Sequence, residues 1–317
     1  MNKRRKNNNS KIISLIVVTL CIIFGLSSEQ INETFGLITN TISNQETTTQ
    51  DNSSQTKQTT SQQGELQVYF LDVGQADSIL IKSNNEYMLI DGGNNNDGPL
   101  LVKYFQSLGI KEFKYIVGTH PHEDHIGGLD DVIKNFTIDN IYIPDAMTTT
   151  KTFEDLLDSI DEKNLTYKVP KINSTFSLGN ANLKVIYTGT DTSDLNNTSI
   201  VLKLTYQDIS ILLTGDATSE TEKKILNKDI NSTVLKVGHH GSKYSSTESF
   251  LKKVNPKYAI ISVGKNNIYN HPATTTINKL EKLNTQIYRT DQDGTILLET
   301  NGHNIDIEKL KTNTNGG

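Results

Sequence analysis

Three histidines and one aspartate lie within six positions of the stretch Thr119–Gly128. The stretch follows the apolar run at 115–117 and ends in a glycine pair, so these side chains are expected at a strand end. Neutral imidazole and carboxylate suit zinc and other first-row divalent ions. The spacing divides the four possible ligands into two pairs, one for each of two ions: His120 with His122, and Asp124 with His125.

The distribution of the other histidines favours a metal site over a solvated polar loop. The chain holds seven histidines, and six of them fall in three polar motifs: the stretch above, Gly238-His239-His240-Gly241 and Asn270-His271-Pro272. The one cysteine, Cys21, belongs to an apolar segment near the N-terminus. Cysteine-ligated zinc, disulfides and thiol nucleophiles are therefore excluded from the rest of the chain.

Acidic residues also follow several other apolar runs. Asp72 and Asp77 come after the run 66–71, Asp91 follows 87–90, and Asp216 follows 209–213. Turn chemistry alone explains an aspartate beside a glycine, and for Asp91 a turn role and a supporting role beside the ligands stay equally open. We place Asp72, Asp77 and Asp91 behind the metal ligands.

Hydrophobic periodicity predicts strands and helices in both halves of the chain, in a similar order. This pattern favours two sheets packed face to face with helices outside, an α/β sandwich. Asp293-Gly294 is typical of a hairpin turn between a strand near 287 and a strand at 296–298. The other expected strands are 66–71, 79–81, 87–90, 115–117, 141–143, 176–178, 183–187, 200–204, 209–213, 234–237 and 258–262, and the expected helices are 98–108, 126–136, 153–160, 245–254 and 274–283.

The N-terminal part predicts export. The basic cluster Lys3-Arg4-Arg5-Lys6 precedes an apolar stretch of 15 residues at 12–26, which is short for a membrane span of ~20 residues and near the upper limit for a signal-peptide core. We read residues 1–30 as a signal peptide or an uncleaved membrane anchor. Residues 31–64 are expected to be a flexible polar linker, and 65–312 one folded domain. The expected location is therefore extracytoplasmic, either secreted or membrane-anchored.

Charge limits the partners. Residues 1–30 carry five cations and one anion, so the remaining chain sets 26 cations against 35 anions, a net charge of −9. An acidic body is not the footprint of a protein that binds long nucleic acid through many phosphates, although it permits a local basic groove.

Taken together, the motifs resemble those of the metallo-β-lactamase-like hydrolases. The chain is most similar to the branch found in DNA-uptake competence proteins (ComEC-like) and in surface phosphorylcholine esterases. The resemblance spans about residues 65–300. The motifs that carry it are H-x-H-x-D-H at 120–125, Asp72-Val73-Gly74-Gln75-Ala76-Asp77-Ser78, Asn196-Asn197-Thr198-Ser199, Leu213-Thr214-Gly215-Asp216-Ala217, Gly238-His239-His240-Gly241-Ser242 and Asn270-His271-Pro272.

The resemblance implies a four-layered αββα sandwich with two divalent ions, zinc or manganese, at one sheet edge. Asp216 would bridge the ions, His120 and His122 would bind the first, and Asp124, His125 and His271 the second. Many relatives have a third first-site histidine between the loop and the bridging aspartate, but residues 126–238 contain none. We assign His239 to the metal, because it alternates with Leu235 and Val237. His240 is assigned to the substrate, and the reverse order stays open.

The chemistry implied is hydrolysis by a metal-activated water, with Asp124 or Asp216 orienting the water and His240 or Lys243 stabilising the reacting group. Asn197, Ser242 and Lys243 are expected to bind substrate, with Asn196 as the alternative to Asn197, and His303 is expected at the surface. A phosphodiester is the first candidate substrate: single-stranded DNA or a cell-envelope polymer such as teichoic acid. A lactam or lactone hydrolase and a non-catalytic accessory protein of DNA uptake are the alternatives. No protein partner is evident.

Overall fold

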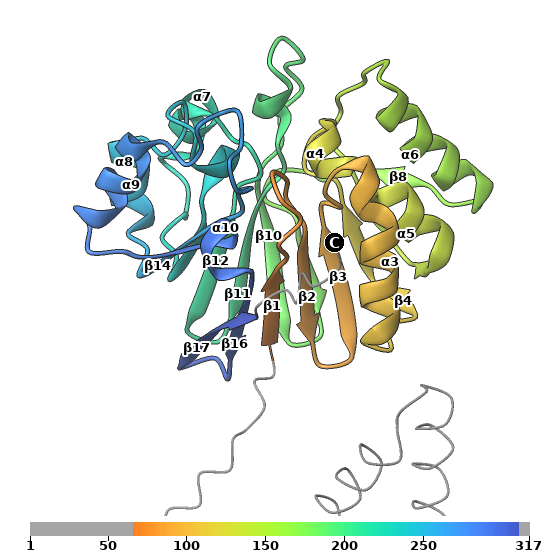
Figure 1. Ribbon diagram of the computed structural model, residues 1–317, viewed down its shortest axis with the longest axis horizontal. Coiled ribbons are helices and arrows are strands. Elements are labelled where there is room, and N and C mark those ends of the chain that lie inside the picture. The colour runs from red at the N-terminus through yellow and green to blue at the C-terminus, as the bar shows by residue number, and fades with distance from the viewer. Residues whose placement is uncertain (1–65, 311–317) are drawn as a thin grey trace, which may run out of the picture. The chain divides into compact units, whose positions relative to one another are not determined.

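The computed structural model describes residues 66–310. These residues form two large sheets that pack face to face, with helices on both outer sides (Figure 1). The signal or anchor segment and the linker lie outside the described residues, so the predictions made for 1–64 stay predictions. Within 66–310, none of the helices is both long and apolar enough to cross a membrane.

The first sheet has eight strands in the order β17-β16-β1-β2-β3-β5-β7-β8. Its strands β3, β5, β7 and β8 run parallel to one another, and the other neighbours are antiparallel. The bounds are β1 Leu66–Phe70, β2 Ile79–Ser83, β3 Glu86–Ile90, β5 Tyr115–Val117, β7 Ile141–Tyr142, β8 Tyr167–Lys168, β16 Thr295–Thr300 and β17 Ile305–Leu310.

The second sheet has seven strands in the order β15-β14-β13-β12-β11-β10-β9. Strands β9 to β12 form an antiparallel meander, and β12 to β15 run parallel. The bounds are β9 Thr175–Leu178, β10 Ala181–Tyr187, β11 Val201–Tyr206, β12 Ile209–Leu213, β13 Val234–Lys236, β14 Tyr258–Ile261 and β15 Gln286–Arg289. A small separate pair joins β4 (Glu112–Phe113) to β6 (Thr137–Ile138).

Apolar side chains that alternate along the strands form three buried clusters, one between the two sheets and one under the helices on each outer side. In β1, Val68 and Phe70 face the second sheet, while Leu71 at the strand end packs under the helices. Side chains of successive strand residues point to opposite faces, so one strand serves two cores. The helices over the first sheet are α3 (Gly98–Ser107), α5 (Leu129–Asn135) and α6 (Lys151–Glu162). Those over the second sheet are α7 (Ser219–Ile225), α8 (Glu248–Val254) and α9 (Thr274–Glu281).

The predicted α/β sandwich is confirmed, but one local prediction is wrong and one helix begins later than expected. Asp293-Gly294 does not close a hairpin, because β15 belongs to the second sheet and β16 to the first, with the short helix α10 (Thr290–Asp293) between them. The helix expected at 126–136 is α5, which begins at Leu129, and the separate short helix α4 (Glu123–Ile126) precedes it. The glycine pair Gly127-Gly128 separates them and lets the chain pass close to neighbouring backbone.

Candidate metal centre

The centre lies where parallel strands of both sheets end. The H-x-H-x-D-H loop follows β5 and Asp91 follows β3, its parallel neighbour in the first sheet. Asp216 follows β12, and the pair His239-His240 follows β13, the parallel neighbour of β12 in the second sheet. Carboxyl ends of parallel strands meet at one edge, which is where ligands bind in such sheets. The packing of the sheets therefore brings four separate loops together.

Asp91 orients the H-x-H-x-D-H loop. Its carboxylate accepts hydrogen bonds from the Thr119 backbone N–H at 2.7 Å and from the Thr119 hydroxyl at 2.8 Å. The same carboxylate lies 2.8 Å from Nδ1 of His125. Nδ1 therefore carries a proton and donates it, which leaves Nε2 of His125 facing the centre. Of the two roles that the sequence left open for Asp91, a turn residue or a support for the candidate ligands, these contacts favour the second.

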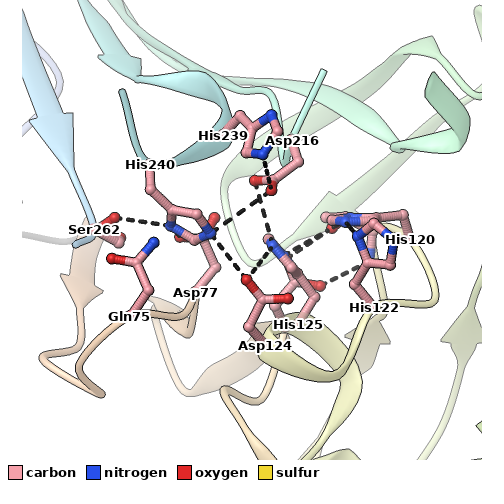
Figure 2. Close-up of polar contacts among 12 residues, drawn as sticks. Gln75, Asp77, His120, His122, Asp124, His125, Asp216, His239, His240 and Ser262 are labelled. Atoms are coloured by element: carbon pink, nitrogen blue, oxygen red, sulfur yellow. Dashed lines mark hydrogen bonds and ion pairs between the residues drawn. The ribbon is translucent and has the colours of Figure 1, made fainter. Parts of the chain in front are cut away.

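His240 is oriented in the same way from the other sheet. Its Nδ1 lies 2.9 Å from the backbone carbonyl of Ser262 and 3.5 Å from Oδ1 of Asp77, so Nδ1–H donates and Nε2 faces the centre (Figure 2). Asp77 in turn forms a 2.7 Å ion pair with Lys236, and both side chains are buried. Lys236 therefore holds in place the Asp77 carboxylate that faces the His240 ring.

Four side chains then converge on one point. Nε2 of His240 lies 3.2 Å from Asp124 Oδ2 and 3.6 Å from Asp216 Oδ2, and Nε2 of His125 lies 3.3 Å from Asp216 Oδ1. One ligand atom from each of Asp124, His125, Asp216 and His240 lies within 4.8 Å of the others. Nε2 of His125 and Oδ1 of Asp216 are buried without a hydrogen-bond partner. Buried polar atoms of this kind require an explanation, and a cation between them supplies one.

The second pair of ligands lies beside this cluster. Nε2 of His120 is 3.0 Å from Nδ1 of His122. The Thr119 hydroxyl donates its proton to Asp91. At 3.2 Å its oxygen therefore accepts a hydrogen bond from Nδ1–H of His120. Nε2 of His120 therefore presents a lone pair towards His122. The His120 ring is buried, with its centroid 4.1 Å from that of His125.

The charges around the centre suit a cation. Burial lowers the pKa of His120 well below its ordinary value, and burial also lowers the pKa of His122, so both imidazoles are neutral ligands at neutral pH. Burial would raise the pKa of Asp216, but the adjacent His125 and His240 hold it well below its ordinary value. Burial would lower the pKa of His125, but Asp216, Asp91 and Asp124 outweigh it and raise this pKa well above its ordinary value. Three carboxylates thus stabilise positive charge at one point.

A cleft of about 340 Å³ opens over the centre. We use "the cleft" for the space lined by Gln75, His122, Glu123, Asp124, Asn196, Asp216, His239, His240, Tyr269 and His271. His271 is half-buried in its wall, where burial and the neighbouring His239 and His240 lower its pKa to about 4. His271 lies outside the cluster of four, with its ring centroid 5.7 Å from that of His239.

The structure places the two adjacent histidines in the reverse of the order assigned from the sequence. His240 joins the cluster, whereas His239 lies in the cleft wall with its Nε2 3.8 Å from Asp216 Oδ2 and 24% of its side chain exposed. Strand alternation fails here because β13 ends at Lys236 and both histidines have positive φ angles, 52° and 51°. This left-handed turn, η3 (Gly238–Gly241), sends the second ring to the centre.

Asn197, Ser242 and Lys243, which were expected to bind substrate, do not line the cleft, and neither does Asp72, which was expected behind the ligands. Asn197 is buried, and its side-chain carbonyl accepts from the hydroxyls of Thr218 and Thr221. Ser242 is buried in the turn after η3, and Lys243 is exposed with its ammonium 5.1 Å from the centre of the Tyr244 ring. The carboxylate of Asp72 accepts from the Gly74 N–H in a tight turn. His303 is exposed and pairs with Asp208 at 2.7 Å.

Of the two asparagines offered from the sequence, Asn196 lines the cleft. Sequence reasoning assigned no role to three other lining residues, Gln75, Glu123 and Tyr269. Gln75 lies within the motif at 72–78, and its Oε1 accepts from the Gly264 N–H at 3.1 Å, which joins the two sheets beside His240. Glu123 lies inside the H-x-H-x-D-H spacing, and Tyr269 immediately precedes the Asn270-His271 motif. Each of these residues therefore lies in or next to a motif, but the direction of its side chain depends on the fold.

A family model for the metallo-beta-lactamase superfamily matches residues 71–265. The chain belongs to this superfamily. The family predicted from the H-x-H-x-D-H loop and the later motifs is therefore confirmed.

Similar proteins agree with the competence-protein branch. The chain is 31% identical over 253 residues to ComE operon protein 3 of Bacillus subtilis (strain 168), covering 73% of this chain and 33% of that protein. It is 26% identical over 255 residues to competence protein ComA of Neisseria gonorrhoeae, covering 78% and 34%. The chain thus spans about a third of the length of these relatives. The metallo-beta-lactamase fold protein YhfI from Bacillus subtilis shares the fold, with a TM-score of 0.50, 11% identity and coverage of 71% and 96%.

The residues present fit a metal centre of this superfamily. The unpartnered His125 Nε2 and Asp216 Oδ1 face each other, and Asp124 and His240 complete a set of nitrogen and oxygen donors. Such a donor set suits zinc or manganese. Asp124, His125, Asp216 and His240 would hold one ion, and His120 and His122 would hold a neighbouring one.

Proposed function

We propose that this protein is a hydrolase with two divalent ions that cleaves phosphodiesters outside the cytoplasm. The observation that carries the proposal is the cluster of Asp124, His125, Asp216 and His240, with the His120–His122 pair beside it and an open cleft above. Paired ions in such centres lower the pKa of bound water towards ~7 and stabilise both the attacking and the leaving oxygens of a displacement. The chain offers no cysteine nucleophile after Cys21.

The roles of the protein's own residues follow from their exposure. Asp124 has 32% of its side chain exposed to the cleft, so its carboxylate accepts a hydrogen bond from the attacking water and orients it. His240 is buried, with Nδ1 held by the Ser262 carbonyl and Nε2 directed at the cluster, so it would hold an ion and does not contact substrate. His239 is the more exposed of the pair and faces the cleft, so its imidazole contacts a phosphoryl oxygen.

Three observations support a small or single-stranded phosphodiester. Two-ion centres suit the paired oxygens of a phosphodiester. Competence protein ComA carries a name that refers to competence, which favours DNA among phosphodiesters for this chain. The net charge of −9 after residue 30 disfavours extended contacts with duplex DNA. The apolar stretch at 12–26 supports an extracytoplasmic location, with a cell-envelope polymer as a further accessible substrate.

The test is a side-by-side assay of the purified, metal-loaded protein. The substrates are bis-nitrophenyl phosphate, single-stranded DNA, a phosphorylcholine ester, nitrocefin and a homoserine lactone, each with zinc and with manganese. We expect phosphodiester cleavage to exceed lactam and lactone cleavage, with salt-sensitive activity on single-stranded DNA. Faster turnover of nitrocefin or the lactone would assign the protein to carbonyl hydrolysis. DNA binding without cleavage by the metal-loaded protein would assign it to an accessory role.

A further inference from the structure

Two adjacent asparagines in the short helix η2 (Leu195–Thr198) have opposite environments. The side-chain oxygen of Asn197 is buried and accepts from Thr218 and Thr221, and its amide nitrogen lies 3.2 Å from Glu220. The side-chain oxygen of Asn196 is also buried, but it has no hydrogen-bond partner. A buried amide oxygen without a partner destabilises the fold, and a ligand at that position would satisfy it.

The backbone holds η2 against both halves of the metal centre. The Ile200 N–H donates to the carbonyl of Thr119, at the start of the H-x-H-x-D-H loop, at 2.9 Å. The Asp216 N–H donates to the hydroxyl of Ser199 at 3.1 Å. These contacts couple the segment that carries Asn196 to the loops that carry the candidate ligands. Asn196 lines the cleft together with His122 and Asp216.

His120 and His122 would supply only two of the protein ligands that an ion beside them needs. Asp124, His125 and His240 are grouped around the neighbouring position, and only Asp216 can be shared. The ring centroids of His239 and His271 lie 5.7 Å apart in the cleft wall, and neither residue belongs to the cluster of four. Two imidazoles and one shared carboxylate would be three protein ligands, which leaves room for both water and a further protein donor around an ion that prefers octahedral coordination, such as manganese. A side-chain amide oxygen is a neutral, hard donor that suits manganese and similar ions.

We propose that Oδ1 of Asn196 is a protein ligand of the ion held by His120 and His122, in place of a third histidine. This inference rests on the proposed two-ion centre and adds a preference between metals at one of its two sites. An amide oxygen in place of an imidazole shifts the first site towards manganese and away from zinc, because imidazole nitrogen is the better donor for zinc. The second site has two imidazoles and two carboxylates, and Asn196 does not alter its relative affinity for zinc and manganese.

The test compares substitutions at Asn196 in the full-length protein by metal content and affinity, without substrate. Asn196→Leu keeps the approximate volume and removes the oxygen, so we expect the weaker of two manganese affinities to fall by at least about 10-fold. Asn196→Asp keeps an oxygen donor and adds charge, so both ions should be retained. Asn196→His should raise the affinity of the same site for zinc relative to manganese. Isothermal titration and elemental analysis measure these changes, and the manganese spectrum in electron paramagnetic resonance reports loss of a coupled pair.

The exposed Asn182 of β10 provides the matched control, because Asn182→Leu makes the same chemical change away from the cleft. Circular dichroism and melting of the metal-free proteins establish that Asn196→Leu is folded; if it is not, Asn196→Asp and Asn196→His carry the comparison. Two unchanged manganese affinities in a folded Asn196→Leu variant would overturn the inference and leave the hydrolase proposal standing. A wild-type protein that binds no ion would overturn both, and metal-loaded protein without phosphodiesterase activity would remove only the proposed function.

Discussion

Each buried imidazole of the candidate centre is oriented by a partner at its other nitrogen. Asp91 holds Nδ1 of His125, the Ser262 carbonyl holds Nδ1 of His240, and the Thr119 hydroxyl holds Nδ1 of His120. In all three the Nε2 atom is left to face the centre. Such partners fix both the tautomer and the ring direction, so they control metal affinity without touching the metal.

Asp216 is the residue whose loss should have the widest effect. Asp216→Asn removes the charge that faces His125 and His240 while keeping the shape of the side chain. We expect metal affinity and hydrolysis to fall together, by at least about 100-fold in the rate constant. Titration of metal and steady-state kinetics on one preparation measure both. Turnover near the wild-type level would show that Asp216 does not serve the centre.

The buried pair Lys236–Asp77 behind His240 gives a second prediction. Lys236→Met leaves the Asp77 carboxylate buried without its cation, and breaking such a pair costs about 3–5 kcal/mol of unfolding free energy. The double variant Lys236→Met/Asp77→Leu should recover much of that stability. Its metal affinity should stay below wild type, because the contact between Asp77 and Nδ1 of His240 is lost. Urea unfolding and metal titration separate the two effects, and full recovery of both would show that the pair is only structural.

At the scale of elements, the centre depends on how closely the loops approach one another. The H-x-H-x-D-H loop turns from α4 into α5 at Gly127-Gly128, against the backbone of the loop after β3. The Gly92 N–H donates to the carbonyl of His125 at 2.6 Å, and the Gly127 N–H donates to the carbonyl of Gly93 at 2.9 Å. The loop that carries the ligands and the loop that carries Asp91 are therefore joined through their backbones.

Gly128→Ala tests this approach. A β-carbon at Gly128 would lie 2.5 Å from the Gly92 carbonyl oxygen and 2.8 Å from the backbone nitrogen of Gly98, and neither atom can rotate away. We expect a loss of about 1–3 kcal/mol in unfolding free energy and a weaker metal affinity. Gly109→Ala is the control, because φ is +74° there but no atom lies within 4 Å of the added carbon. The control should lose stability and keep metal affinity; equal affinity in both variants would contradict the prediction.

At the scale of the molecule, the candidate centre joins the two sheets. His120, Asp124 and His125 come from the first sheet, and Asp216 and His240 from the second (Figure 2). The core between the sheets holds their inner faces together, and Gln75 of the first sheet accepts from Gly264 of the second. An ion held by both groups of ligands would therefore stabilise the folded state as a whole.

Removal of metal should lower the melting temperature in one cooperative step. Ligand present at 100 times its dissociation constant stabilises a protein by about 2.7 kcal/mol, which corresponds to roughly 5–10 °C for a domain of this size. Scanning calorimetry before and after chelation, and again after manganese or zinc is restored, measures the change. Asp216→Asn provides the comparison, since its melting should respond little to chelation. An identical melting temperature with and without metal would argue against an ion between the sheets.

The sequence by itself determined the features that depend on neighbours along the chain. The density of ligands at 120–125 and the apolar runs with acids at their ends identified the superfamily and most of the strands. Strand alternation and helical spacing are local properties, so an α/β sandwich could be predicted before any contact was known. The loop of candidate metal ligands could be identified for the same reason, because these residues lie within six positions.

Only the tertiary structure decided the choices between adjacent residues. His240 rather than His239 reaches the cluster because both adopt positive φ angles after β13, and Asn196 rather than Asn197 lines the cleft because α7 engages the second amide. Asp293-Gly294, where a hairpin turn was expected, instead leads from α10 into β16 of the other sheet, because the chain crosses between sheets there. Neighbours in sequence differ by one step along the chain but can point to opposite sides of it, and the packing of the two sheets determines which side becomes the centre.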